Sequence, residues 1–179
     1  MTFLGKKLFR IKALISFGNV EEGELGGYVE KEENLSNDGD AWVFGDARVF
    51  GDARVSGNAR VSGNAEVFGD ARVFGDAEVF GDARVFGDAR VSGNARVSGN
   101  AEVSGNADYA TVQGFGSEYR TTTFFRTKAG DIGVRCGCFY GTLEEFRAKV
   151  KETHRETKTA KEYLMVADLM EFRFSKEEV

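Results

Sequence analysis

The chain has 179 residues, with 23 glycines and no proline, so its tight turns are expected to combine glycine with aspartate or asparagine. Its formal net charge of −5 argues against general binding of nucleic acid or anionic lipid. One histidine and two cysteines exclude a three-histidine catalytic zinc site, a multi-cysteine zinc site and a disulfide scaffold. No apolar run approaches the roughly 20 residues of a membrane span. We therefore expect a cytoplasmic protein without a membrane partner.

Residues 1–36 come before the regular part of the sequence and are predicted to form an N-terminal cap that leads into it. A hexad with the pattern Val-Phe/Ser-Gly-Asp/Asn-Ala-x then repeats eleven times without a slip from Val43 to Asp108. A degenerate twelfth hexad, residues 37–42, precedes these and keeps Gly39, Asp40 and Ala41 in register.

Each hexad contains a short extended segment and a corner. If Ala-Arg-Val-Phe is extended, alanine and valine point inward, and the arginine and phenylalanine positions point outward. The glycine with its aspartate or asparagine tolerates the positive φ of a tight turn. A short strand and a sharp corner every six residues predict a parallel β-helix.

An internal duplication supports a coil made of three hexads. Residues 43–66 and 79–102 are identical, and the second stretch begins six hexads after the first. Because six hexads are two coils of three, the duplication returns every residue to the same face of the predicted solenoid. Twelve hexads then form four coils.

These residues carry a family resemblance. The hexads resemble those of hexapeptide-repeat proteins, whose left-handed β-helix is a triangular prism with three hexads in each coil. Residues 25–36, the Trp42-Val-Phe-Gly-Asp stretch and residues 10–20 resemble hexapeptide-repeat proteins encoded by bacteriophages and prophages. The resemblance covers roughly residues 8–112. It implies the fold and a phage or bacterial origin, hence the cytoplasm of a bacterial host, and it implies little about activity.

The sequence after the hexads changes in composition. Residues 121–127 and 132–140 are predicted to pair as a hairpin. A capping box at residues 142–145 predicts a helix, and a second helix is expected near residues 159–174. The predicted fold is therefore mainly β: a left-handed parallel β-helix in residues 37–115 after the cap, and a small ββαα domain in residues 116–179.

The outward aromatic residues are the first candidate functional feature. Three of them stack on one face of the predicted solenoid, and the others lie on the remaining two faces. A contiguous aromatic surface favours an interface with further copies of the chain, as a dimer or a trimer. Two alternatives are that the terminal segments fold over these faces, and that duplication has copied phenylalanine together with aspartate. The candidate interface residues are Phe44, Phe50, Phe68, Phe74, Phe80 and Phe86.

A column of like charges is the second candidate site. Arg54, Arg72 and Arg90 are expected to lie above one another, and guanidinium groups suit phosphate. The neighbouring Phe74 is placed to stack a base. Alternatively, the corner aspartates two residues before each arginine neutralise the column. These aspartates also suit a hard cation, but capping of the corner is the commoner role, so we expect no metal and no cofactor.

The remaining reactive side chains have ordinary structural interpretations. Cys136 and Cys138 lie two residues apart in the predicted strand, and we expect them to be buried thiols. His154 follows the apolar spacing of the first helix and is expected to be partly buried or on the surface.

We therefore predict a non-catalytic binding or assembly protein, a rigid oligomeric scaffold that engages a host component, with interference in a host defence as the purpose implied by the resemblance. One alternative is a protein that sequesters a small anion or a nucleotide through the arginine column or a groove between subunits. The other is a hexapeptide-repeat acyltransferase. Against the acyltransferase, no histidine precedes residue 154, and no loop interrupts the hexads.

Overall fold

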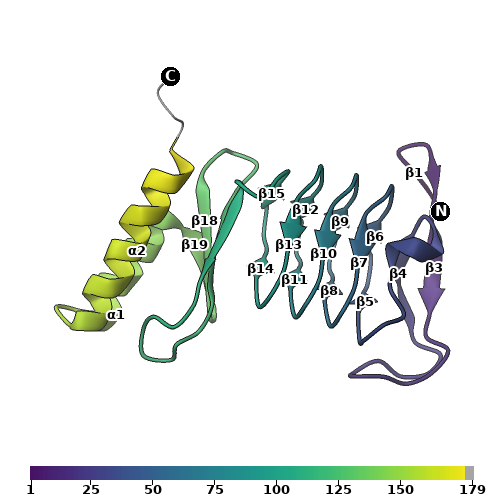
Figure 1. Ribbon diagram of the computed structural model, residues 1–179, viewed down its shortest axis with the longest axis horizontal. Coiled ribbons are helices and arrows are strands. Elements are labelled where there is room, and N and C mark those ends of the chain that lie inside the picture. The colour runs from purple at the N-terminus through teal and green to yellow at the C-terminus, as the bar shows by residue number, and fades with distance from the viewer. Residues whose placement is uncertain (176–179) are drawn as a thin grey trace. The chain divides into compact units, whose positions relative to one another are not determined.

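The computed structural model describes residues 1–175, and the chain divides into two compact units, Met1–Asn106 and Ala107–Val179. The first unit is a β-solenoid of about four coils, built from two-residue parallel strands (Figure 1). Its first face contains β7 (Arg54–Val55), β10 (Arg72–Val73) and β13 (Arg90–Val91). Its second contains β5 (Trp42–Val43), β8 (Arg60–Val61), β11 (Glu78–Val79) and β14 (Arg96–Val97). Its third contains β6 (Arg48–Val49), β9 (Glu66–Val67), β12 (Arg84–Val85) and β15 (Glu102–Val103).

The register confirms the coil of three hexads. Arg72 pairs with Arg54 on one side and with Arg90 on the other. Backbone hydrogen bonds join each coil to the next: the amide of Arg54 donates to the carbonyl of Ala71 at 2.9 Å, and the amide of Ser56 donates to that of Val73 at 3.0 Å. Because each coil repeats the hydrogen bonds of the one before it, the three faces are rigid and regularly spaced.

Small inward side chains form the core of the solenoid. The valines from Val43 to Val103 and the alanines from Ala47 to Ala101 at the inward positions are all fully buried. The corner glycines from Gly45 to Gly99 have positive φ, as the hexad predicts, whereas Gly105 does not. At Gly51, a Cβ would lie only 3.1 Å from the amide nitrogen of Gly69 in the next coil, so the corners also require glycine for close stacking.

The N-terminal segment extends the solenoid at its first coil. A hairpin, β1 (Thr2–Phe3) and β2 (Lys6–Lys7), is followed by β3 (Phe9–Lys12) and β4 (Leu25–Val29). β4 lies parallel to β6, and β3 lies antiparallel to β4 at the edge of the same sheet. After the 3-10 turn η1 (Glu32–Asn34), Leu35 bridges to Val55 in parallel.

The second unit is a four-stranded antiparallel sheet with two helices. The strands pair in chain order: β16 (Tyr109–Val112), β17 (Thr122–Arg126), β18 (Ile132–Cys136) and β19 (Phe139–Thr142). The helices are α1 (Leu143–His154) and α2 (Lys158–Phe174). The capping box at the start of α1 is confirmed, because the Thr142 hydroxyl accepts a hydrogen bond from the Glu145 amide and the Glu145 carboxylate accepts one from the Thr142 amide. Neither helix has the length and apolar character of a membrane span.

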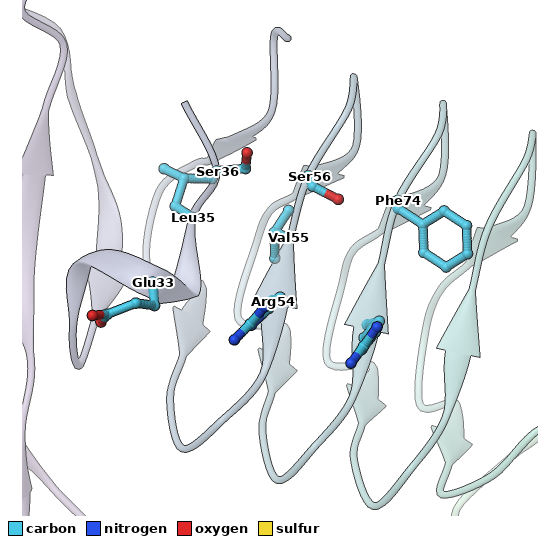
Figure 2. Close-up of a pocket in the computed structure, with 8 residues that line it drawn as sticks. Glu33, Leu35, Ser36, Arg54, Val55, Ser56 and Phe74 are labelled. Carbon is cyan, nitrogen blue, oxygen red and sulfur yellow. The ribbon is translucent and has the colours of Figure 1, made fainter. Parts of the chain in front are cut away.

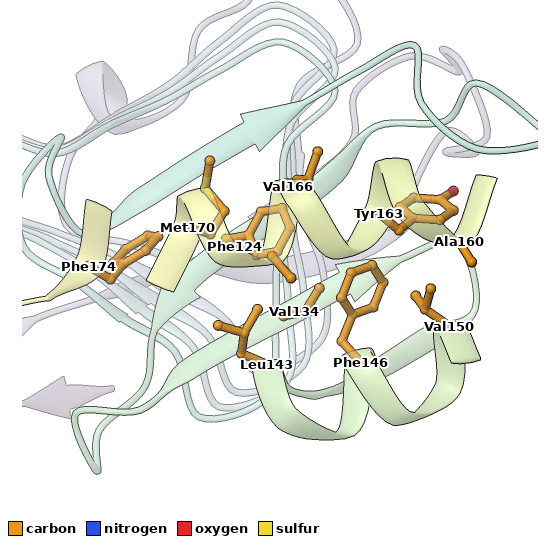
Figure 3. Close-up of a cluster of buried hydrophobic side chains, with 11 residues drawn as sticks. Phe124, Val134, Leu143, Phe146, Val150, Ala160, Tyr163, Val166, Met170 and Phe174 are labelled. Carbon is orange, nitrogen blue, oxygen red and sulfur yellow. The ribbon is translucent and has the colours of Figure 1, made fainter. Parts of the chain in front are cut away.

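This unit differs from the predicted ββαα order in two places. β16, which the sequence assigned to the end of the solenoid, pairs with β17. The predicted strand 132–140 is broken into β18 and β19 by a two-residue turn at Gly137, where φ is +56°. Phe124 and Val134 on the sheet and Phe146 on α1 pack against the inner side of α2 (Figure 3).

Candidate functional site

A column of three arginines lies on the β7–β10–β13 face of the solenoid. Arg54, Arg72 and Arg90 occupy the same position of adjacent parallel strands, and all three are exposed. Neighbouring strands lie about 4.7–4.9 Å apart, so the column places positive charges side by side at that spacing. The valine that follows each arginine is fully buried in the core, which anchors the backbone of the column.

An open groove of about 540 Å³ runs along this face, a size typical of small-molecule sites. Arg54 and Arg72 both line it. Figure 2 shows the ring of Phe74, 39% exposed, at one end. The opposite end is built by the segment around η1. Its lining residues are Glu33, Leu35, Ser36, Arg54, Val55, Ser56, Arg72 and Phe74.

Neither arginine of the groove forms a direct ion pair with the described residues. Among residues 1–175, no carboxylate lies within ion-pair distance of Arg54 or Arg72. The nearest corner aspartate, Asp52, instead accepts a hydrogen bond from Lys31 at 2.6 Å, which lowers the pKa of Asp52 and raises that of Lys31. The Glu33 carboxylate points away from Arg54 in Figure 2. The corner aspartates therefore make no direct ion pair with these two arginines in the described part of the chain, although Asp52 and Arg54 attract each other electrostatically.

The corner aspartates do not form a metal site. Within the described part of the chain, no group of three or more histidine, cysteine, aspartate or glutamate side chains is placed to hold a metal ion.

The aromatic stack on the β6–β9–β12 face is partly covered. The rings of Phe50, Phe68 and Phe86 are stacked nearly parallel, with 5.0 Å between successive centroids. Phe3 from the N-terminal hairpin packs edge-on against Phe50 and buries it. Phe68 and Phe86 remain half-buried. A terminal segment therefore covers one end of this stack, as one of the sequence-based alternatives anticipated.

The other three predicted interface residues are divided between two faces. Phe44 and Phe80 are half-buried, and the Arg96 guanidinium lies 5.5 Å from the centre of the Phe80 ring. Phe74 alone among the six is exposed. The geometry thus leaves much less aromatic surface accessible than six outward phenylalanines predict.

Alternating charges run beside the aromatic stack. Arg48 and Arg84 both lie 3.4 Å from the carboxylate of Glu66, and Arg84 also lies 3.9 Å from Glu102. Glu66 is buried between its two partners. This face is therefore internally neutralised.

The second unit contains the two cysteines and the histidine whose burial was predicted from the sequence. Cys138 lies exposed in the turn between β18 and β19, so the prediction of a buried thiol is wrong for this residue. Cys136 is half-buried and accepts a hydrogen bond from the Thr122 hydroxyl at 3.2 Å. His154 is half-buried, as predicted, and its ring packs 5.7 Å from that of Tyr163.

Comparison with known proteins agrees with the solenoid architecture. Residues 53–67 and 89–105 match the family model of the YdcK beta solenoid repeat. The chain is a repeat β-solenoid protein. Both matched stretches of this β-solenoid lie within the hexads, and the first contains Arg54, at the start of the groove. No curated protein matches the chain.

The sequence did not indicate the wall of the groove that Glu33, Leu35 and Ser36 provide. These residues precede the regular hexads, and the parallel bridge from Leu35 to Val55, together with the hydrogen bond from the Ser36 amide to the Val55 carbonyl, brings them beside the arginine column. The spacing was a weak indication of this contact. Leu35 lies slightly more than one coil before Val55 in the sequence, and residues one coil apart lie beside each other in a solenoid.

Proposed function

We propose that this β-solenoid is a non-catalytic binding protein that holds an anionic ligand in the groove of its β7–β10–β13 face. The observation that carries the proposal is the pair Arg54 and Arg72, which lie in register and exposed, with no carboxylate of the described residues within ion-pair distance of either guanidinium group. Like charges directly opposite one another destabilise a sheet. An anion between these two guanidinium groups relieves that repulsion and gains charge-assisted hydrogen bonds.

The chemistry of the groove favours a phosphate-containing ligand. Guanidinium groups bind phosphate oxygens in pairs, and the exposed face of Phe74 offers a surface on which a base can stack. Ser36 and Ser56 add hydroxyl groups beside the arginines. Inorganic phosphate, pyrophosphate and nucleotides are therefore the first ligands to test.

The decisive experiment is thermal unfolding with and without these ligands. We expect at least one of them to raise the Tm, and Arg72→Ala to abolish that shift without lowering the Tm of the unliganded chain, because the substitution removes a repulsive neighbour. Arg60→Ala is the matched control, since Arg60 occupies the same strand position on another face. No shift across the panel, or a shift that survives in Arg72→Ala, would eliminate this function.

Self-association through the aromatic stack is a second candidate. It is favoured by the rigid alignment of Phe68 and Phe86, whose nearly parallel rings are only half-buried. We expect light scattering to show an oligomer that Phe68→Ser and Phe86→Ser weaken, while Phe74→Ser on another face does not. A wild-type chain that is monomeric at every concentration contradicts this candidate.

The biological setting of the proposal comes from the resemblance to phage and prophage proteins. In that setting the protein acts in the bacterial cytoplasm on a host component, by sequestering a host nucleotide or by binding a host protein. Catalysis is not part of the proposal, because the solenoid has no histidine and no loop between its hexads. An acyl-transfer activity that is lost in His154→Ala would restore the acyltransferase alternative.

A further inference from the structure

Two cysteines lie on either side of one glycine at the tip of the β18–β19 hairpin. Cys136 ends β18, Gly137 and Cys138 form the turn, and Cys136 pairs with Phe139 at the start of β19. Two peptide units keep the Cα atoms of the cysteines within about 7 Å of each other, and the chain reverses direction at Gly137, where φ is +56°. The Cα atoms of a disulfide are usually about 4.4–6.8 Å apart. The turn is therefore compatible with a disulfide between the two residues.

The two thiols have different surroundings. Cys138 is exposed, whereas Cys136 is half-buried. The Cys136 sulfur accepts a hydrogen bond from the Thr122 hydroxyl at 3.2 Å, and its thiol donates one to the Tyr163 hydroxyl at 3.9 Å. Because a reactive thiol must be reached from solvent, Cys138 is the one that meets a reagent first. Cys136 is held one residue away from the turn position where that reaction takes place.

Arg120 adds a positive charge to the same turn. A Cβ at Gly137 would lie 3.0 Å from Nη1 of Arg120, so the guanidinium group packs directly against the glycine between the cysteines. Arg120 pairs with Glu118 at 3.5 Å, and both side chains are exposed. Exposed ion pairs contribute little, so Arg120 can exchange Glu118 for a carboxylate of an incoming molecule. The turn therefore favours a reagent that carries negative charge.

We propose that Cys136 and Cys138 are a site of reversible oxidation that exchanges with small anionic disulfides of the glutathione class. A disulfide that closes a ring over one intervening residue is strained, and strained or exposed disulfides are labile rather than structural. Disulfides of this transient kind are the ones found in reducing compartments. The pair lies in the second unit of the chain, so the proposal does not depend on the ligand of the solenoid groove.

The reaction takes place in two exchange steps. The Cys138 thiolate attacks one sulfur of the small disulfide, the bond between its two sulfurs breaks, and one small thiolate leaves and takes up a proton. The Cys136 thiolate then attacks the Cys138 sulfur of the mixed disulfide, and the second small thiol leaves in the same way. Both cysteine protons end on the released thiols. Two cysteines are thus oxidised while one small disulfide is reduced to two thiols.

Oxidation changes a contact in the core of the second unit. In the disulfide, the Cys136 sulfur has no proton to donate to Tyr163, which belongs to the core between α2 and the sheet. The sulfur must also turn from Thr122 toward Cys138. We therefore expect the oxidised chain to have a lower Tm than the reduced chain, because the hydrogen bonds of Cys136 are lost.

Equilibration of the full chain in mixtures of reduced and oxidised glutathione, followed by rapid alkylation and mass spectrometry, tests the pairing. We expect wild type to yield the dithiol and an internal disulfide lighter by two hydrogens, which a reductant converts back. Cys136→Ser is expected to accumulate the glutathione adduct of Cys138 roughly tenfold or more above wild type, because the second thiol no longer displaces glutathione. Cys138→Ser is expected to react more slowly than Cys136→Ser, since its remaining thiol is half-buried. Circular dichroism verifies that both variants are folded.

The choice of reagent tests the role of Arg120. Arg120→Ala is expected to slow oxidation by glutathione disulfide roughly twofold to fivefold and to leave the rate with neutral hydroxyethyl disulfide unchanged. Lys128→Ala, which removes an exposed cation at the opposite end of β18, is the matched control and should change neither rate. Three results would overturn the proposal: no internal disulfide in wild type, equal accumulation of the adduct in wild type and Cys136→Ser, or equal effects of Arg120→Ala and Lys128→Ala on the glutathione reaction.

Discussion

Asn34 illustrates how a single buried polar residue joins the N-terminal segment to the solenoid. Its side chain is fully buried, and its carbonyl oxygen accepts hydrogen bonds from the amides of Glu30 and Lys31. Its amide group donates to the backbone carbonyls of Gly51 and Ala53 in the next coil. A buried polar group is stable only when its hydrogen bonds are made, and the four partners of Asn34 fix the turn at η1 that positions one wall of the groove.

Tyr163 is the residue from which we predict a dependence of stability on pH. It is 8% exposed, and the backbone of Gly116 packs closely against its hydroxyl. Burial, with a contribution from Cys136, raises the pKa of Tyr163 from 10.0 to about 12. Below pH 10 the folded and unfolded states both hold the proton. Between pH 10 and 12 the unfolded state loses it first, so the free energy of unfolding falls as the pH rises, by up to about 3 kcal/mol.

Denaturant unfolding at several alkaline pH values measures this effect. Tyr163→Phe is expected to reduce the loss of stability between pH 10 and 12, and the exposed variant Tyr119→Phe is expected to keep it. Equal slopes in wild type and Tyr163→Phe would contradict the assignment.

At the level of strands and corners, the choice between two kinds of hexad decides which side chains stack at each corner. In the regular hexads serine is followed by a Gly-Asn corner, and phenylalanine by a Gly-Asp corner. At two of the three corners asparagine and aspartate alternate from coil to coil, and the Asn58 amide donates to Asp76 at 3.0 Å, as the Asn64 amide does to Asp82. The third corner instead stacks Asp52, Asp70 and Asp88. Two corners are therefore hydrogen-bonded, and the third places like charges above one another.

Opposite effects are predicted for two substitutions at these corners. Asn58→Asp replaces a hydrogen bond by a repulsive pair and is expected to lower stability by up to about 1 kcal/mol, whereas Asp70→Asn relieves repulsion and is expected to raise it by a similar amount. Both changes should shrink at high salt, since these charges are exposed. Thermal unfolding at low and high salt checks both signs, and the same sign for both variants would refute this account.

At the scale of the whole molecule, the coil of three hexads is the unit that a deletion must respect. Removing residues 61–78 takes out one complete coil and leaves every later residue on its original face. Removing residues 61–69 deletes fewer residues, but these are one and a half hexads. The later coils are then out of register, and their corner glycines lie beside strand positions of the earlier coils. We expect the longer deletion to retain β-type circular dichroism and cooperative unfolding at a lower Tm, and the shorter one to lose the single cooperative transition. A shorter deletion that unfolds as cooperatively as the longer one would contradict the register.

The hexads by themselves determined the solenoid, its glycine corners, its valine and alanine core and the in-register column of Arg54, Arg72 and Arg90. They could do so because each hexad contains its own strand and corner, and neighbouring coils repeat the same contacts. The ladder of alternating charges around Glu66 follows from the same periodicity.

Only the tertiary structure decided the features that depend on segments distant in sequence or on a local turn. Phe3 covers Phe50, and the segment around η1 supplies a wall of the groove, because β4 and Leu35 join the solenoid outside the hexad pattern. The turn at Gly137 exposes Cys138, and the two-helix packing leaves one side of α2 uncovered. Periodic sequence specifies contacts that repeat, whereas these contacts each occur once, so their geometry depends on how the whole chain packs.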